Sequence, residues 1–442
     1  MDSLDILWLS EALHFKTGYG TVSRELCERW DAMGHNVNAV GWYVTGDSYP
    51  YCKEVNGKYE MTGVKQLAGE MSIGCGKRID NKTSIFEKIL EKTNPDVVSS
   101  LVDIWYSPHI ISVTNKLDVP FCNYFPLDGE PFPPEWLQAM MKSDQVIAMS
   151  KWGKAKMDEQ LEWQYGIKKD IPVIPHGVNT KNFYPLEQAE IDALKKELGW
   201  DKKFIVGFVG KNMSRKCIPR LMKAFKFFHD QHPDSILVMN VGNPLMSDYG
   251  GNLSYLTKLL GIEKDVVTVG DILTHNNGIT IEKLRELYNL FDVHCSATSG
   301  EGFGLTTIES QACGTPSIIC DYTTASELTN DGENGWLVPP VTYVEGQFGV
   351  LRAMVDIPSM TKALCDAYDN PDKVAKFGKA GAKFVKKNYN WDDIAVDYVN
   401  FLKKTADNFI PEPKRYKEFP KFRKKFLTPP KVRKRANNKA RK

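Results

Sequence analysis

Residues 299–309 read Ser-Gly-Glu-Gly-Phe-Gly-Leu-Thr-Thr-Ile-Glu, and they follow a short apolar run at Phe291–Ser296. A run of this kind is typical of a buried strand, and the range Leu305–Ala312 has the spacing of a helix. Gly302 and Gly304 allow the backbone between the two elements to approach a ligand closely. The stretch therefore predicts a strand, a tight loop, and a helix whose first amides can bind an anion.

Two carboxylates flank this expected anion site. Glu301 precedes the amides of Gly304, Leu305 and Thr306, and Glu309 lies about one turn into the helix. Carboxylates in such positions can accept hydrogen bonds from pairs of hydroxyls, so that one could hold a sugar and the other a ribose. Acidic residues that merely complement the helix dipole are the alternative.

A basic loop, Gly210–Lys216, follows the apolar strand predicted at Phe204–Val209. Lys211, Arg215 and Lys216 supply three cations after a glycine at a strand end, which suits the neutralisation of phosphate. A solvated basic turn is the alternative.

A glycine-rich segment, Gly18-Tyr19-Gly20, lies between a first strand at Asp5–Ser10 and a helix predicted at Val22–Met33. It lacks the third glycine of a dinucleotide-binding pattern, and the second strand does not end in an acidic residue. The segment therefore favours a loop that contacts substrate over a site for NAD.

Alternation of strand and helix occurs twice along the chain. It predicts the α/β class, with one Rossmann-like domain over residues 1–185 and a second over 186–388, which contains the strand Pro316–Cys320. In open parallel sheets, ligands bind beyond the carboxyl ends of the strands. We therefore expect the two domains to face each other across a cleft that carries the chemistry.

Charge is distributed unevenly. The 442 residues hold 57 basic and 55 acidic side chains, but residues 411–442 alone have net charge +12, which leaves −10 for the rest. We expect a basic, disordered tail over 405–442 that is attracted to phosphate, either on an anionic membrane surface or in nucleic acid. A tail that only keeps the protein soluble is the alternative.

The remaining composition favours a cytoplasmic protein, with the tail able to hold it at the inner face of a membrane. Nine cysteines show no metal-binding spacing, and the N-terminus reads as a strand instead of a signal peptide. No apolar window is long enough to span a bilayer. We expect no metal site and no cofactor.

Taken together, five motifs resemble glycosyltransferase family 4, over about residues 5–404. Glu301–Glu309 looks like the E-x7-E signature of that family. Gln311–Pro316 continues this signature. The other four motifs are Pro175–Asn179 with Phe183–Pro185, which resembles the end of the family's N-terminal domain, the basic loop Gly210–Lys216, the segment Gly18–Gly20, and Asn390-Trp391, which opens a helix that crosses back to the first domain over 389–404.

The resemblance implies a GT-B fold and transfer of a sugar, with retained anomeric configuration and without a metal, from a nucleotide-diphosphate sugar to a hydroxyl acceptor on a glycan, a lipid-linked molecule or another substrate. The first domain would handle the acceptor. Catalytic roles are implied for Glu301, Lys211, Lys216 and Asp128, and donor binding for Gly18, Gly20, Arg215, Gly302, Phe303, Gly304, Leu305, Thr306 and Glu309, with Glu309 on the ribose.

Asp128 marks a departure from the family. Many relatives carry a histidine after the strand predicted at Phe121–Phe125, where this chain has a turn at Pro126–Pro131. Asp128 could replace that polar contact, or it could serve only as a turn residue. Two other functions stay open: a glycosyltransferase that acts on modified DNA bases, and an inactive donor-binding partner subunit, which the intact pair Glu301 and Glu309 disfavours.

Overall fold

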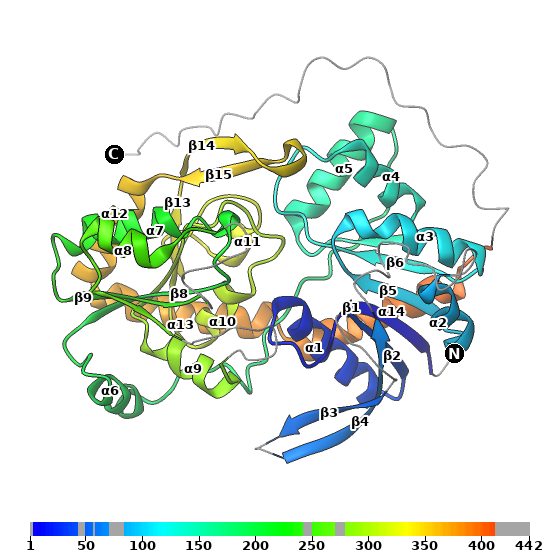
Figure 1. Cartoon of the computed structure of the whole chain (residues 1–442), viewed down its shortest axis with the longest axis horizontal. Helices are drawn as coiled ribbons and strands as arrows, with labels where there is room; N and C mark the ends of the chain where they lie inside the picture. The colour runs from blue at the N-terminus through cyan, green and yellow to red at the C-terminus, as the bar shows by residue number, and fades with distance from the viewer. Residues whose placement is uncertain are drawn as a thin grey trace.

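The computed structural model describes residues 3–42, 49–55, 58–69, 84–241, 250–269 and 279–411. They form two α/β domains, each built on a mainly parallel sheet flanked by helices, which lie side by side in Figure 1. The fold class expected from the sequence is therefore confirmed.

The first domain holds a seven-stranded sheet in the order β3-β4-β2-β1-β5-β6-β7. Its strands are β1 (Asp5–Glu11), β2 (Asn36–Trp42), β3 (Tyr49–Val55), β4 (Lys58–Gly69), β5 (Val97–Leu101), β6 (Phe121–Tyr124) and β7 (Gln145–Ile147). Its helices are α1 (Gly18–Ala32), α2 (Ile85–Thr93), α3 (Ser107–Lys116), α4 (Pro134–Lys142) and α5 (Lys151–Tyr165). Only β3 runs antiparallel to its neighbour; β3 and β4 carry several charged and polar residues, so no apolar run predicts them.

Helix α1 begins earlier than the expected Val22. The Thr17 side chain caps the helix by accepting a hydrogen bond from the Gly20 amide at 3.1 Å. The segment Gly18–Gly20 is thus the first turn of α1 and not a loop, because a good cap outweighs the low helix propensity of glycine. A Cβ on Gly20 would lie 2.3 Å from the Phe15 carbonyl oxygen, so this position admits only glycine.

The second domain holds a six-stranded parallel sheet in the order β10-β9-β8-β11-β12-β13. Its strands are β8 (Phe204–Val209), β9 (Ser235–Asn240), β10 (Val266–Thr268), β11 (Val293–Ser296), β12 (Ser317–Cys320) and β13 (Gly335–Val338). Its helices are α6 (Gln188–Glu197), α7 (Ile218–His229), α8 (Leu253–Leu260), α9 (Ile281–Leu290), α10 (Leu305–Ala312), α11 (Ala325–Leu328), α12 (Ile357–Asp369) and α13 (Pro371–Asn388). The chain changes direction across the sheet between β8 and β11, and such a switch point is where parallel sheets bind ligands.

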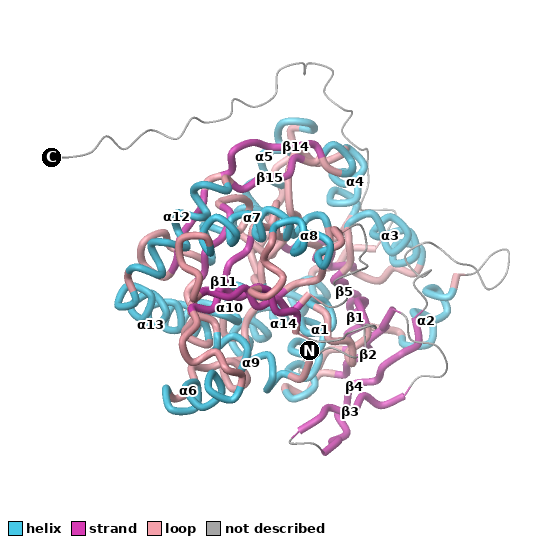
Figure 2. Tube along the Cα trace, turned by 60° about the vertical axis from the view of Figure 1, so that its left-hand side comes forward, coloured by secondary structure: helices cyan, strands magenta, loops and turns pink. Residues whose placement is uncertain are grey.

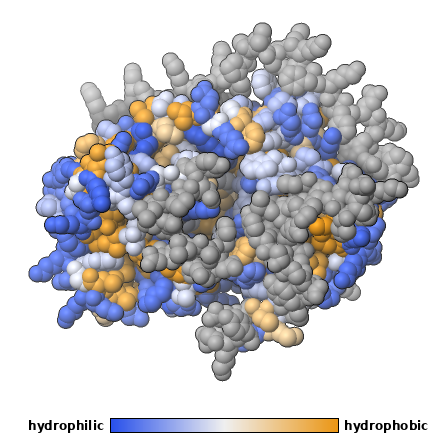
Figure 3. Space-filling view, viewed as in Figure 1, coloured by the Kyte–Doolittle hydropathy of each residue, from blue (hydrophilic) through white to orange (hydrophobic). Residues whose placement is uncertain are grey.

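A separate antiparallel hairpin, β14 (Pro340–Glu345) and β15 (Leu351–Val355), follows β13. Figures 1 and 2 both place its turn beside α4 and α5 of the first domain. In Figure 3, apolar atoms gather on the surface where Figure 1 shows β14, which agrees with the exposure of Val341 and Val344. No sequence pattern predicted this hairpin.

Helix α14 (Trp391–Asp407) returns to the first domain, as expected for a crossover helix. The Trp30 indole donates to the Ala395 carbonyl at 3.1 Å, and the Tyr398 hydroxyl lies 2.9 Å from Ser99 Oγ. The helix ends three residues beyond the expected position 404. Most of the expected basic tail, from residue 412 onward, lies outside the described residues.

Candidate functional site

Three loops meet at the switch point of the second sheet. The loop after β8 and the loop after β11 are joined because the Ser299 amide donates to the Arg215 carbonyl at 2.8 Å. The third is the turn after β6 of the first domain. Cβ atoms on Gly302 and Gly300 would lie 2.4 Å from Pro126 and 2.0 Å from the Asp128 carbonyl oxygen, so the absence of side chains lets the domains touch.

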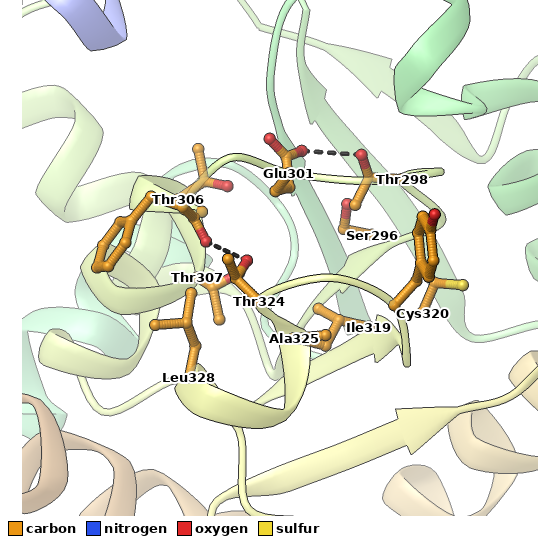
Figure 4. A pocket seen from close by; sticks show the side chains of 13 residues that line it. Ser296, Thr298, Glu301, Thr306, Thr307, Ile319, Cys320, Thr324, Ala325 and Leu328 are labelled. Carbon is orange, nitrogen blue, oxygen red and sulfur yellow. Dashed lines mark hydrogen bonds between the residues drawn. The ribbon is translucent and has the colours of Figure 1, made fainter. Parts of the chain in front are cut away.

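Glu301 lies between two cations. Arg215 Nη1 is 2.6 Å from Oε2 of Glu301, and Lys216 Nζ is 2.6 Å from Oε1. Thr298 Oγ1 donates to Oε1 at 2.8 Å (Figure 4). Burial alone would raise the pKa of Glu301, but the charges of Arg215 and Lys216 hold that pKa down at about 2. Glu301 is therefore a carboxylate throughout the physiological pH range.

Arg215 and Lys216 reach Glu301 because they stand on a 3₁₀ turn, Ser214–Lys216, just before α7. Arg215 also donates to the Gly300 carbonyl at 2.8 Å and places its Nε 3.5 Å from Asp128 Oδ2. Lys211, which is expected to hold the donor diphosphate together with Lys216, is exposed, and the ion pairs of Glu301 are made with Arg215 and Lys216. The ion pair between Arg215 and Glu301 was not predicted from the sequence.

Asp128 lies at the boundary of the two domains, where the sequence predicts the site. Besides Arg215, it contacts Arg352 of β15, whose Nη1 lies 2.7 Å from Asp128 Oδ1. Lys216, Glu301, Arg215, Asp128 and Arg352 therefore form a chain of alternating charges across the domain boundary. Arg352 was missed by sequence reasoning because a single arginine in a mainly apolar strand gives no local signal.

The start of α10 lines a small cavity that opens to solvent. Figure 4 shows Glu301, Thr298 and Ser296 on one side of it and Thr306, Thr307 and Thr324 on another. Gly304 caps the helix with φ +115°, a conformation that favours glycine. All residues that line this cavity belong to the second domain: Ser296, Thr298, Glu301, Phe303, Gly304, Thr306, Thr307, Ile319, Cys320, Tyr322, Thr324, Ala325 and Leu328.

Glu309 does not line this cavity and differs from Glu301 in its electrostatics. It is buried within α10, and the Tyr288 hydroxyl of α9 donates to its Oε2 at 2.8 Å. Burial raises the pKa of Glu309 to about 7, with the Tyr288 hydrogen bond opposing the rise and Glu25 adding to it. The two signature carboxylates are therefore tuned in opposite directions.

The other predicted donor residues lie on both sides of the domain boundary. A Cβ on Gly18 would be 3.6 Å from Leu305 Cδ1, so the starts of α1 and α10 face each other. The Phe303 side chain is buried, and its ring lies 5.0 Å from that of His176 between centroids, which gives it a packing role. Gly20 packs on its own preceding loop at Phe15.

A further pair in the first domain was not singled out from the sequence. The Tyr19 hydroxyl of α1 donates to Asp103 Oδ1 at 3.0 Å, just beyond the end of β5. Burial raises the pKa of Asp103 to about 6, which the Tyr19 hydrogen bond opposes and the neighbouring Asp128 adds to. Its position after a parallel strand was the one signal that could have identified it.

Within the described ranges, no group of three or more His, Cys, Asp or Glu side chains is arranged to hold a metal ion. None of the described helices is long and apolar enough to cross a membrane. Most cysteines of the described chain are buried, and all of these are free thiols.

Two Rossmann-like domains joined by a crossover helix are the features of the GT-B fold. A family model described as "Glycosyl transferases group 1" matches residues 190–384. Among curated proteins, alpha-maltose-1-phosphate synthase of Mycolicibacterium smegmatis is 26% identical over 277 residues, which cover 61% of this chain and 66% of that protein. D-inositol 3-phosphate glycosyltransferase of Streptomyces coelicolor is 26% identical over 278 residues, which cover 58% of this chain and 54% of the relative.

Solved structures agree on the fold. Sucrose-phosphate synthase from Thermosynechococcus elongatus superposes with a TM-score of 0.70 at 20% identity, covering 91% of this chain and 99% of that one. Anabaena HepE in complex with UDP-glucose gives a TM-score of 0.68 at 15% identity, covering 91% and 100%. The second domain is therefore similar in sequence to group 1 glycosyltransferases, and the whole described chain shares their fold. The sequence matches span between about half and two thirds of the curated relatives.

Proposed function

We propose that the protein transfers a sugar from a nucleotide-diphosphate sugar to a hydroxyl acceptor, with retained anomeric configuration and without a divalent metal. The observation that carries the proposal is the pair of cations, Arg215 and Lys216, held on Glu301 beside the start of α10. The complex of HepE with UDP-glucose supports the class of donor.

The leaving nucleoside diphosphate gains negative charge in the transition state. Arg215, Lys216 and the first turn of α10 would stabilise that charge, and because they are already in place the reaction needs little reorganisation. In this site Arg215 and Lys216 would neutralise the charge on the leaving diphosphate, which a divalent metal does in other transferases.

Glu301 would act through an exchange of partners. Before the donor binds, its carboxylate is satisfied by Arg215 and Lys216. The diphosphate competes for both cations, and the released carboxylate can accept hydrogen bonds from hydroxyls of the donor sugar. We assign Glu301 to orienting the sugar through these hydrogen bonds, with the acceptor attacking on the face of the leaving group.

Glu309 would bind the ribose. Tyr288 already bonds its Oε2, and we assign Oε1 to a ribose hydroxyl. Asp128, which the first domain supplies beside Arg215, would lie on the acceptor side of the reaction centre.

A thermal-shift panel of UDP, GDP and ADP and their common sugar derivatives, with and without EDTA, tests the donor site. A ligand that binds only the folded state raises its apparent stability. We expect one nucleotide series to raise the melting temperature equally in EDTA, and Lys216→Ala to abolish the shift while Lys223→Ala, an exposed lysine on α7, retains it. Proton NMR of the product anomer then tests retention. A panel without any shift, or a shift that disappears in EDTA, would contradict the proposal.

A further inference from the structure

The hairpin β14–β15 belongs to the second domain by its place in the chain but packs on the first. Val350, the residue just before β15, is 1% exposed and lies in the hydrophobic core of the first domain. At the turn, the Phe348 ring lies 5.6 Å from Trp105 and 5.8 Å from Trp136 between centroids. The turn of the hairpin is therefore anchored across the domain boundary.

The backbone of β15 bonds alternately to the two domains. The Leu351 amide donates to the Glu130 carbonyl of the first domain at 2.7 Å, and the Ala353 amide donates to the Ser299 carbonyl of the site loop at 3.0 Å. Arg352 stands between these two residues. Its position is therefore fixed from both sides.

From that position Arg352 holds the turn that carries Asp128. Its Nη1 lies 2.7 Å from both the carbonyl oxygen and Oδ1 of Asp128, so a single guanidinium binds the main chain and the side chain. A Cβ on Gly129 would lie 2.5 Å from the Leu351 carbonyl oxygen, which shows how closely the turn fits against β15. A turn rich in proline and glycine has no helix or strand of its own to orient Asp128.

We propose that Arg352 is a positioning residue for sugar transfer: it fixes Asp128 on the acceptor side of the cleft, and the hairpin fastens that turn to the site loop. The inference rests on the proposed function. It explains why Asp128 keeps its place beside Arg215, 3.5 Å away, while Arg215 remains bonded to Glu301 at 2.6 Å. Without Arg352, Asp128 would compete with Glu301 for the same guanidinium.

Donor binding and sugar transfer can be measured separately, because Arg352 lies outside the donor cavity. Every residue that lines it comes from the second domain, and neither Asp128 nor Arg352 is among them. Loss of Arg352 should therefore damage the transfer step and leave donor binding largely intact. A general loss of folding would damage both.

The experiment measures nucleoside diphosphate release from UDP-glucose and GDP-mannose, with water and with p-nitrophenyl glycosides as acceptors, and separately the Kd of UDP and GDP. For Arg352→Ala we expect release to fall about tenfold or more, as misplacement of a reacting group does, with Kd within about twofold of wild type. Arg352→Lys should recover part of the rate, and Asp128→Ala should add little to Arg352→Ala because the pair acts as a unit. Val341→Ala, an exposed residue of β14, is the matched control and should leave release unchanged.

Hydrogen exchange supplies a readout that does not depend on activity. With UDP or GDP present, the amides of 126–131 should exchange faster in Arg352→Ala than in wild type, while those of α10 stay protected. Unchanged exchange over 126–131, a normal rate of release, or a parallel loss of nucleotide affinity and rate would each overturn the positioning role. Failure of wild type to bind any nucleotide would instead contradict the proposed function, and the exchange result would still decide whether Arg352 holds the turn.

Discussion

The opposite electrostatics of the two signature glutamates make nucleotide affinity depend on pH. The pKa of Glu309 is about 7, raised by burial and held from rising further by the Tyr288 hydroxyl at 2.8 Å. If the ionised carboxylate binds the ribose, affinity for UDP or GDP should fall as the pH drops below about 7. Replacing Tyr288 with phenylalanine removes the hydrogen bond and moves the pKa of Glu309 further above neutral.

The size of the effect follows from that hydrogen bond. A hydrogen bond to a charged oxygen stabilises it by about 1.5 kcal/mol or more, which is about tenfold in the ionisation equilibrium. At pH 7 wild-type Glu309 is about half ionised, so Tyr288→Phe should weaken nucleotide binding about fivefold there. At pH 9 both proteins are mostly ionised, and the affinities should converge.

Isothermal titration calorimetry with UDP and GDP between pH 5.5 and 9 measures the effect. Glu309→Gln removes the titrating group and reveals the share of the pH dependence that belongs to the nucleotide. Tyr368→Phe is the matched control, because Tyr368 also donates to a carboxylate, that of Asp234, with both residues outside the cavity lining. A Tyr288→Phe deficit that persists undiminished at pH 9, or no deficit at any pH, would refute the reasoning.

Four further outcomes are expected. Lys216→Ala should reduce kcat about 10²-fold by removing a charge contact to the leaving group, whereas Lys211→Ala, at an exposed position, should reduce it far less; steady-state kinetics compares them. Gly20→Ala should lower the melting temperature by an amount equivalent to about 1–3 kcal/mol or more, since its Cβ would lie 2.3 Å from the Phe15 carbonyl oxygen. The pKa of Glu309 is raised from about 4.5 to about 7 in the folded state, so the protein should lose stability as the pH rises from about 4.5 through 7. Glu309→Gln lacks this titration, and denaturant titrations should therefore show its free energy of unfolding gaining up to about 3 kcal/mol relative to wild type between pH 5 and 8. Deleting residues 412–442 should weaken cosedimentation with anionic vesicles or retention on DNA while leaving turnover with soluble acceptors intact, and equal binding by the truncated protein would exclude a targeting role for the tail.

Local sequence patterns predicted the parts of this site that are local in the chain. The strand, glycine loop and helix around Glu301 are specified within a few residues, so their bounds could be read from periodicity. The choice of Arg215 over Lys211 as the partner of Glu301 depends instead on the 3₁₀ turn before α7, which is set by packing. Composition alone cannot distinguish the three cations.

Contacts between distant segments could not be predicted. Asp128 is held by Arg352, which lies 224 positions later in the chain on a hairpin without a strong strand pattern. Likewise, the pKa of Glu309 depends on Tyr288 from another helix. The incomplete dinucleotide-binding pattern favours a loop at Gly18–Gly20, and only the Thr17 cap shows why a helix begins there.

The crossover helix α14 delays completion of the first domain during synthesis, because it supplies part of that domain's core. Side chains of α14, among them Trp391, Tyr398 and Leu402, share one hydrophobic core with Ile6 and Trp8 of the first strand. At about 5–20 residues per second, a ribosome needs on the order of 20–80 s to advance from that strand to the end of α14. Part of the hydrophobic core of the first domain therefore stays uncovered until α14 has been synthesised. The first domain can complete its fold only after the second domain has been made.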